Sequence, residues 1–238
     1  MSKQTKKYMQ ILFEDEYLLI VNKPSDLLVH HSHYARNIEE LSLVELMNDL
    51  GKKVYPVHRL DRKTSGVLLC VKEKNNVAIF QSLFENQKIE KKYRALLRGH
   101  ITASGVIDSP VKNDRGNYKE AETHYQCLQH VELLIPVEPY PTSRYSLVEF
   151  FPKTGRMHQL RIHANKISHP IIGDPKYGNR HHNHMFIEQF EINHLFLHAR
   201  SLKFIHPFTK LEVEVKAPMP DFWKEVLINQ IADPIFFE

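Results

Sequence analysis

A single carboxylate lies among cationic and hydroxyl side chains at residues 58–69, HRLDRKTSGVLL. Asp61 stands between Arg59 and Arg62, and Thr64 follows three residues later. The apolar run that ends this segment predicts a buried strand, which places the acid at the mouth of that strand. An acid surrounded by groups that bind phosphate is a candidate catalytic residue. The alternative is a surface loop with a solvated charge cluster.

A second basic segment, RMHQLRIHANK at residues 156–166, predicts a short helix that begins near its first residue. Positions three and four apart share a helix face, so we expect His158, Arg161 and Asn165 to point the same way. A guanidinium from this face would keep Asp61 ionised and fix its orientation. The alternative is an exposed basic helix without an acidic partner.

Tyr93 lies in a predicted strand with basic ends, KKYRALLR at residues 91–98. A tyrosine in mid-strand usually belongs to the core or to a sheet face. The flanking lysines and arginine nevertheless suggest that the strand faces an anion, and a phenol ring can stack on a nucleic-acid base.

The remaining pattern predicts many strands, few helices and no alternation of strand and helix. This favours a mixed α+β fold with a largely antiparallel sheet. Residues 1–10 read as a flexible basic tail and residues 11–238 as one catalytic domain. Strands are expected within 11–21 and at 67–71, 91–98, 123–134, 144–151, 195–205 and 211–217, and helices at 42–50, 76–87, 156–166 and from 221.

Composition indicates an ordinary globular protein, with 42% apolar and 25% charged residues in 238. The formal net charge of +4 is compatible with a polyanionic partner without requiring one. Two unpatterned cysteines favour neither a disulfide framework nor a zinc site. No signal peptide or membrane-spanning run is visible, so we expect a cytoplasmic protein.

The histidines raise the question of a metal site. Residues 30, 31 and 33 and residues 181, 182 and 184 are all histidine and are expected in polar loops. Neither cluster has HExxH or paired CxxC spacing, and no phosphate-binding glycine motif occurs. A hydrolase built on the DxxT pattern at Asp61 would need a second acid where Lys63 stands. We therefore expect no metal and no cofactor.

The segment HRLDRKTSGVLL resembles the HRLDxxTSGxLL signature of the RluA-type pseudouridine synthases. EDEYLLIVNKPSDLLVH, QKIEKKYRALLRG, LVEFFPKTGRMHQLRIHANKISHPIIGDPKYG and LFLHARSLKFIHP resemble other segments of the same family. The resemblance runs from about Ile11 to Pro218, and we expect no S4 RNA-binding domain of the kind that some members carry. It implies the pseudouridine synthase fold, an RNA substrate and an isomerase without cofactor.

The resemblance also implies roles for individual residues. Asp61 would attack the target nucleoside and open its glycosidic bond, so that uracil rotates and re-bonds through carbon. Tyr93 would stack on the base, and Arg161 would pair with the aspartate. Arg59 would fill the gap left by the flipped nucleotide, and Leu197 would pack on the base.

Arg62, Thr64 and His158 complete the residues expected to bind the substrate. Residues 140–156 and the short N-terminus are most similar to the branch of the family that modifies uridine 65 of tRNA. Ribosomal RNA as substrate, a catalytically silent RNA-binding protein and a metal-dependent hydrolase remain the alternatives. No obligatory protein partner is evident, and segments 104–118 and 179–191 have no assigned role.

Overall fold

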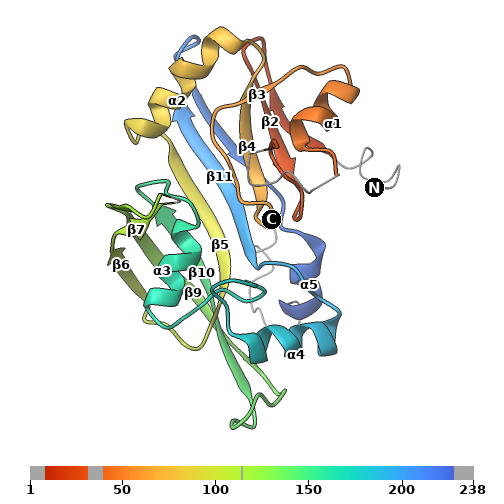
Figure 1. The fold of residues 1–238 in the computed structure, drawn as a ribbon, viewed down its shortest axis with the longest axis vertical. Helices are drawn as coiled ribbons and strands as arrows, with labels where there is room; N and C mark the ends of the chain where they lie inside the picture. The colour runs from red at the N-terminus through yellow and green to blue at the C-terminus, as the bar shows by residue number, and fades with distance from the viewer. Residues whose placement is uncertain (1–8, 32–39, 114, 228–238) are drawn as a thin grey trace. The chain divides into compact units, whose positions relative to one another are not determined.

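The computed structural model describes residues 9–31, 40–113 and 115–227. The chain divides into two compact units, which are drawn in Figure 1. The first unit comprises Met1–Lys91 and Ala199–Ala217, and the second comprises Lys92–His198 and Pro218–Glu238. Most of the expected basic tail and His33 lie outside the described residues. The assignment of 11–238 to one catalytic domain stays a prediction.

The first unit is built on a sheet with a fully buried central strand. Its strand order is β1-β2-β4-β11, with β3 paired to β4 and β12 paired to β11. All seven residues of β4 are buried, as are most residues of β2, so both strands supply core on both faces. The bounds are β1 (Gln10–Glu14), β2 (Leu18–Lys23), β3 (Tyr55–Pro56), β4 (Ser65–Val71), β11 (Leu197–Ile205) and β12 (Glu212–Lys216).

Among its described residues, the first unit has the α-helices α1 (Leu43–Asp49) and α2 (Val77–Glu85), the latter preceded by the 3₁₀ turn η3 (Lys74–Asn76). The expected capping box begins α1. The Ser42 hydroxyl accepts from the Glu45 amide at 3.4 Å, and the Ser42 amide donates to the Glu45 carboxylate at 2.7 Å. Phe80 of α2 is fully buried in the core of this unit.

The second unit has the strand order β11-β5-β10-β9-β6, and a small separate sheet of β7 and β8. The long strand β10 pairs antiparallel with β5 on one side and with β9 on the other. Figure 1 shows α3 in front of β9 and β10, and Leu160 and Ala164 of α3 are in the core. The bounds are β5 (Glu90–Arg98), β6 (Ser104–Asp108), β7 (Val111–Lys112), β8 (Tyr118–Lys119), β9 (Glu122–Leu133), β10 (Ser143–Pro152), α3 (Gln159–Lys166), α4 (Arg180–Phe190) and α5 (Asp221–Leu227).

The predicted α+β class with a mixed, mostly antiparallel sheet is confirmed. Two local predictions are wrong. The histidine-rich segment forms helix α4 instead of a polar loop, because the Asn179 side chain accepts from the amides of His181 and His182 and caps the helix. Helix α3 begins at Gln159 instead of near Arg156. None of the helices within the described ranges is long and apolar enough to cross a membrane.

Candidate active-site residues

Asp61 lies in a tight turn immediately before β4. The Thr64 amide donates to the Asp61 carbonyl at 3.0 Å, which closes the turn. Thr64 is buried, Asp61 is half-buried, and Arg59 and Arg62 are exposed. The sequence prediction of an acid at the mouth of a buried strand is therefore confirmed for the first unit.

A buried lysine holds this turn. Lys23, at the end of β2, is 0% exposed, and its ammonium donates to the carbonyls of Pro24 at 2.8 Å, Leu27 at 2.8 Å and Arg62 at 3.0 Å. Burial lowers the pKa of Lys23 to about 7, against the opposing attraction of Asp26 and Asp61. Lys23 thus joins the turn that follows β2 to the turn that carries Asp61, and adds a group near the acid that gains or loses its charge around neutral pH.

A second set of contacts joins the same two turns closer to the surface. The Ser25 hydroxyl donates to the Lys63 carbonyl at 2.7 Å, and the Lys63 ammonium lies 3.4 Å from the Asp26 carboxylate. Arg62 donates through Nε to the Asp26 carbonyl at 3.1 Å and lies 3.1 Å from Glu40. Exposed pairs of this kind contribute little free energy, so a phosphate could displace the Glu40 carboxylate from Arg62.

Two residues of the motif serve β4 directly. Gly66 has φ +111°, and a Cβ at that position would overlap the backbone of Ala199 in β11. His58 accepts a hydrogen bond from the Leu69 amide through Nε2 at 3.0 Å. Burial lowers the pKa of His58 to about 3, so the ring is neutral and can accept this bond. These two residues support the strand from which the Asp61 turn departs.

Arg161 is held by a buried carboxylate in the second unit. Its Nε lies 2.7 Å from Oδ2 of Asp174, and its Nη2 lies 2.8 Å from Oδ1, a bidentate pair. The two side chains are 6% and 1% exposed. Asp174 also accepts from the amides of Lys176 and Tyr177. Burial raises the pKa of Asp174, but Arg161 and these amides outweigh that effect and leave the pKa below its ordinary value.

Tyr177 connects His158 with Arg161. The Arg161 guanidinium lies 5.2 Å from the centre of the Tyr177 ring, and the Tyr177 hydroxyl lies 3.1 Å from Nδ1 of His158. The predicted helix face of His158, Arg161 and Asn165 is wrong, because His158 precedes α3 in a left-handed conformation with φ 55°. Asn165 is exposed, whereas Arg161 is buried.

Tyr93 and Leu197 belong to the sheet of the second unit. Tyr93 in β5 pairs with Phe150 in β10 and is half-buried against the core. Its neighbour Arg94 lies 2.9 Å from Glu149, so this flanking cation is already paired with a carboxylate. Leu197 in β11 is 3% exposed and part of the core. Their contacts with a base, and the pairing of Asp61 with Arg161, stay predictions.

Sequence reasoning missed three residues: Lys23, Asp174 and Tyr177. Lys23 could have been found as the one cation that ends the apolar strand LLIVNK, and Asp174 as a lone acid after the apolar run PIIG. Tyr177 carries no comparable signal. Asp174 lies thirteen residues from Arg161, so no helix spacing relates the two side chains.

The three histidines of α4 face different surroundings. His182 is buried, and its Nδ1 lies 2.9 Å from the Tyr145 hydroxyl, whereas exposed His184 pairs with Glu188 at 3.0 Å. Over the described ranges, no group of three or more histidine, cysteine, aspartate or glutamate side chains could hold a metal ion.

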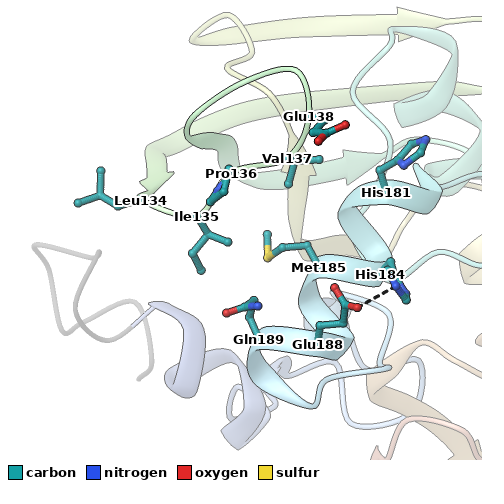
Figure 2. Close-up of a pocket in the computed structure, with 10 residues that line it drawn as sticks. All are labelled: Leu134, Ile135, Pro136, Val137, Glu138, His181, His184, Met185, Glu188 and Gln189. Carbon is teal, nitrogen blue, oxygen red and sulfur yellow. Dashed lines mark ion pairs between the residues drawn. The ribbon is translucent and has the colours of Figure 1, made fainter.

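A cavity of about 570 Å³ lies beside α4, in the second unit. Figure 2 shows Met185 of α4 pointing toward Ile135, in the chain segment that leaves β9. The two glutamates on its wall make it a poor site for phosphate. None of the residues singled out in the sequence as catalytic or substrate-binding lines this cavity. Its lining residues are Leu134, Ile135, Pro136, Val137, Glu138, His181, His184, Met185, Glu188 and Gln189.

Comparison with known proteins agrees with the motifs. The family described as RNA pseudouridylate synthase matches residues 17–166. tRNA pseudouridine synthase C of Vibrio parahaemolyticus is 38% identical over 229 residues, which cover 92% of this chain and 93% of the relative. That of Pasteurella multocida is 39% identical over 230 residues, covering 92% and 95%.

Two solved human structures are similar to this one. Human RNA Pseudouridylate Synthase Domain Containing 1 has a TM-score of 0.73 at 26% identity, covering 92% of this chain and 87% of that one. Human RNA Pseudouridylate Synthase Domain Containing 4 has a TM-score of 0.73 at 25% identity, covering 94% and 95%. The chain belongs to the RNA pseudouridylate synthase family.

Proposed function

We propose that this protein isomerises uridine 65 of tRNA to pseudouridine, with Asp61 as the catalytic residue. The observation that carries the proposal is the identity of 38–39% with tRNA pseudouridine synthase C, over about nine-tenths of both chains. The proposal places the enzyme in the cytoplasm. The reaction needs no net oxidant or reductant, because the product is an isomer of the substrate, and we propose that it proceeds without a cofactor.

The reaction breaks the bond between N1 of uracil and C1′ of the ribose and forms a bond from C5 to C1′. The proton on C5 leaves and N1 gains one, so atoms and electrons balance. The Asp61 side chain is the group that attacks the nucleoside. The turn closed by the Thr64 amide fixes the backbone from which the half-buried carboxylate projects, and buried Lys23, with a pKa of about 7, supplies positive charge nearby when it is protonated.

The target base is inaccessible while it is stacked, so the uridine must leave the helix at a cost of a few kcal/mol. Exposed Arg59 would fill the gap that it leaves, and Arg62 would bind phosphate after releasing Glu40. Thr64 would bind the substrate beside the Asp61 turn that its amide closes.

The residues of the second unit would bind the base and steady the acid. Tyr93 would stack on uracil and Leu197 would pack against it. Arg161, held by Asp174, would pair with Asp61. His158, whose ring nitrogen contacts the Tyr177 hydroxyl, would contact the RNA. A guanidinium that is already oriented by a buried carboxylate has less freedom to lose when it binds.

Release of tritium from tRNA labelled at C5 of uridine tests the chemistry. Asp61→Asn should abolish release while the protein still binds tRNA. Asp49→Asn, which neutralises an exposed acid at the end of α1, should turn over normally. Retained turnover in Asp61→Asn would refute the catalytic role.

Mapping of pseudouridines in total RNA, with and without the gene, tests the substrate. Loss of the modification at uridine 65 of tRNA is the expected result. Loss in ribosomal RNA alone would move the same chemistry to the alternative substrate. No change in any RNA, with tRNA binding intact, would favour a non-catalytic RNA-binding protein.

A further inference from the structure

The hairpin formed by β7 and β8 presents an aromatic ring and cations to solvent. Residues 111–119 contain three cations and one acid. Tyr118 is 66% exposed, and Lys112 and Lys119 are also exposed. A ring that is this exposed contributes little to a core, so the Tyr118 side chain is accessible to a ligand.

The Tyr118 ring has a cation beside it and a hydrogen-bonded turn next to it in the chain. Lys112 lies directly across from Tyr118 in the strand pair, and its Nζ is 5.9 Å from the ring centre. Beyond the strands, the Asn113 side chain accepts from the amides of Arg115 and Asn117 at 3.0 and 2.9 Å. The exposed Tyr118 ring, with the Lys112 cation beside it, is a surface on which a nucleic-acid base can stack.

The base of the hairpin is attached to helix α3, which carries Arg161, and Figure 1 shows the two elements side by side. Nε2 of His163 lies 2.8 Å from the Ser109 carbonyl, and the Lys166 ammonium donates to the Ser109 hydroxyl and the Pro110 carbonyl, each at 2.6 Å. Val111 is 2% exposed. The hairpin is therefore an anchored projection of the second unit.

We infer that this hairpin binds the RNA strand outside the reactive nucleotide. Tyr118 stacks on an unpaired base, while Lys112 and Lys119 contact the phosphates next to it. Two acids, Glu120 and Glu122, follow β8. The Glu122 carboxylate lies 2.6 Å from Nε2 of His124, and Arg156 donates to the Glu120 carbonyl, so the Arg156 cation lies at this acidic end of the hairpin. The inference rests on the proposed function in one respect, that the ligand is the tRNA substrate.

Binding of fluorescently labelled tRNA, measured over a range of salt concentrations, tests the inference. All variants carry Asp61→Asn, so that affinity is measured without turnover. Tyr118→Ala should weaken binding by roughly 5- to 100-fold, the range for loss of one base–aromatic stack, whereas Tyr118→Phe should bind as the parent does. The double variant Lys112→Ser/Lys119→Ser should reduce the slope of log affinity against log salt by about two, one for each lost phosphate contact.

The matched control removes two exposed lysines from other elements, Lys216 in β12 and Lys224 in α5, and should leave the slope nearly unchanged. Circular dichroism and thermal melting confirm that each variant is folded. The inference would be overturned if Tyr118→Ala and Tyr118→Phe bound tRNA with equal affinity. It would also be overturned if removing the hairpin lysines and removing the control lysines reduced the salt slope equally. Wild-type protein, with Asp61 intact, that binds tRNA but forms no pseudouridine, while the hairpin variants lose affinity as expected, would refute the proposed function alone.

Discussion

Replacing Lys23 by methionine removes three hydrogen bonds: two to carbonyls in the turn after β2, and one to the Arg62 carbonyl in the Asp61 turn. Net loss of about 1 kcal/mol for each bond predicts destabilisation by about 3 kcal/mol. Methionine also removes the cost of burying a charge, so the net deficit near pH 7 should be smaller than this sum. The pH dependence of the deficit is the sharper test.

The folded pKa of Lys23, about 7, lies below its ordinary value of 10.5. Between these values the unfolded chain binds more protons at this residue, so the stability of the wild type rises with pH. The shift corresponds to a gain of about 2 kcal/mol between pH 7 and pH 9. Lys23→Met lacks this gain, so its deficit relative to the wild type should widen by the same amount.

Urea unfolding followed at pH 7, 8 and 9 measures the widening. Lys216→Met serves as the control, because it removes an exposed lysine from the same unit, and its difference from the wild type should stay within about 0.5 kcal/mol. Wild-type and Lys23→Met stabilities that run parallel from pH 7 to pH 9 would show that Lys23 does not titrate as a buried lysine.

If the proposed function holds, Lys23→Met should also lower kcat more than it raises the Kd for tRNA, since it loosens the turn that carries Asp61.

Two further predictions concern the elements that support the site. Gly66→Ala should destabilise the protein by about 2–5 kcal/mol, because a φ of +111° is strained for alanine and the added Cβ overlaps the backbone of β11. Gly155→Ala should be nearly neutral in the same unfolding assay, because a Cβ added there meets no atom within 4 Å. Asp174→Asn should cost about 3 kcal/mol at pH 7, because it leaves the buried Arg161 guanidinium without its carboxylate. In the wild type, the stabilisation by ionised Asp174 is complete above its ordinary pKa of 3.8 and is lost as pH falls through the lower pKa of the folded state. The difference in free energy of unfolding between the wild type and Asp174→Asn should therefore shrink in acid. A difference that does not change with pH would contradict this.

Local signals predicted most of the elements. The capping box at Ser42 and Glu45 correctly placed the start of α1, because both partners are three residues apart. The predicted strands that became β4, β5, β9 and β10 are confirmed within one or two residues. The helix α4 was missed although Asn179 is a strong N-cap, because a run of histidine and asparagine lacks a clear apolar face.

Long-range contacts account for what sequence reasoning missed. His158 was assigned to the helix by spacing alone, but the Gln159 side chain accepts from the Arg156 amide and donates to the Glu122 carbonyl, which fixes the chain before α3 outside the helix. The Arg62 carbonyl that accepts a hydrogen bond from Lys23 is 39 residues away in the sequence, and no spacing rule relates the two residues.

The amino-acid sequence by itself determined the family, the position of Asp61 before a buried strand and most element boundaries, because these depend on motifs and on periodicities within a few residues. Only the tertiary structure decided which cations are buried and what holds them. Lys23 and Arg161 are charged side chains like their exposed neighbours in sequence. Each is buried because distant parts of the chain bring carbonyl or carboxylate oxygens around it and replace the water that the charge has lost.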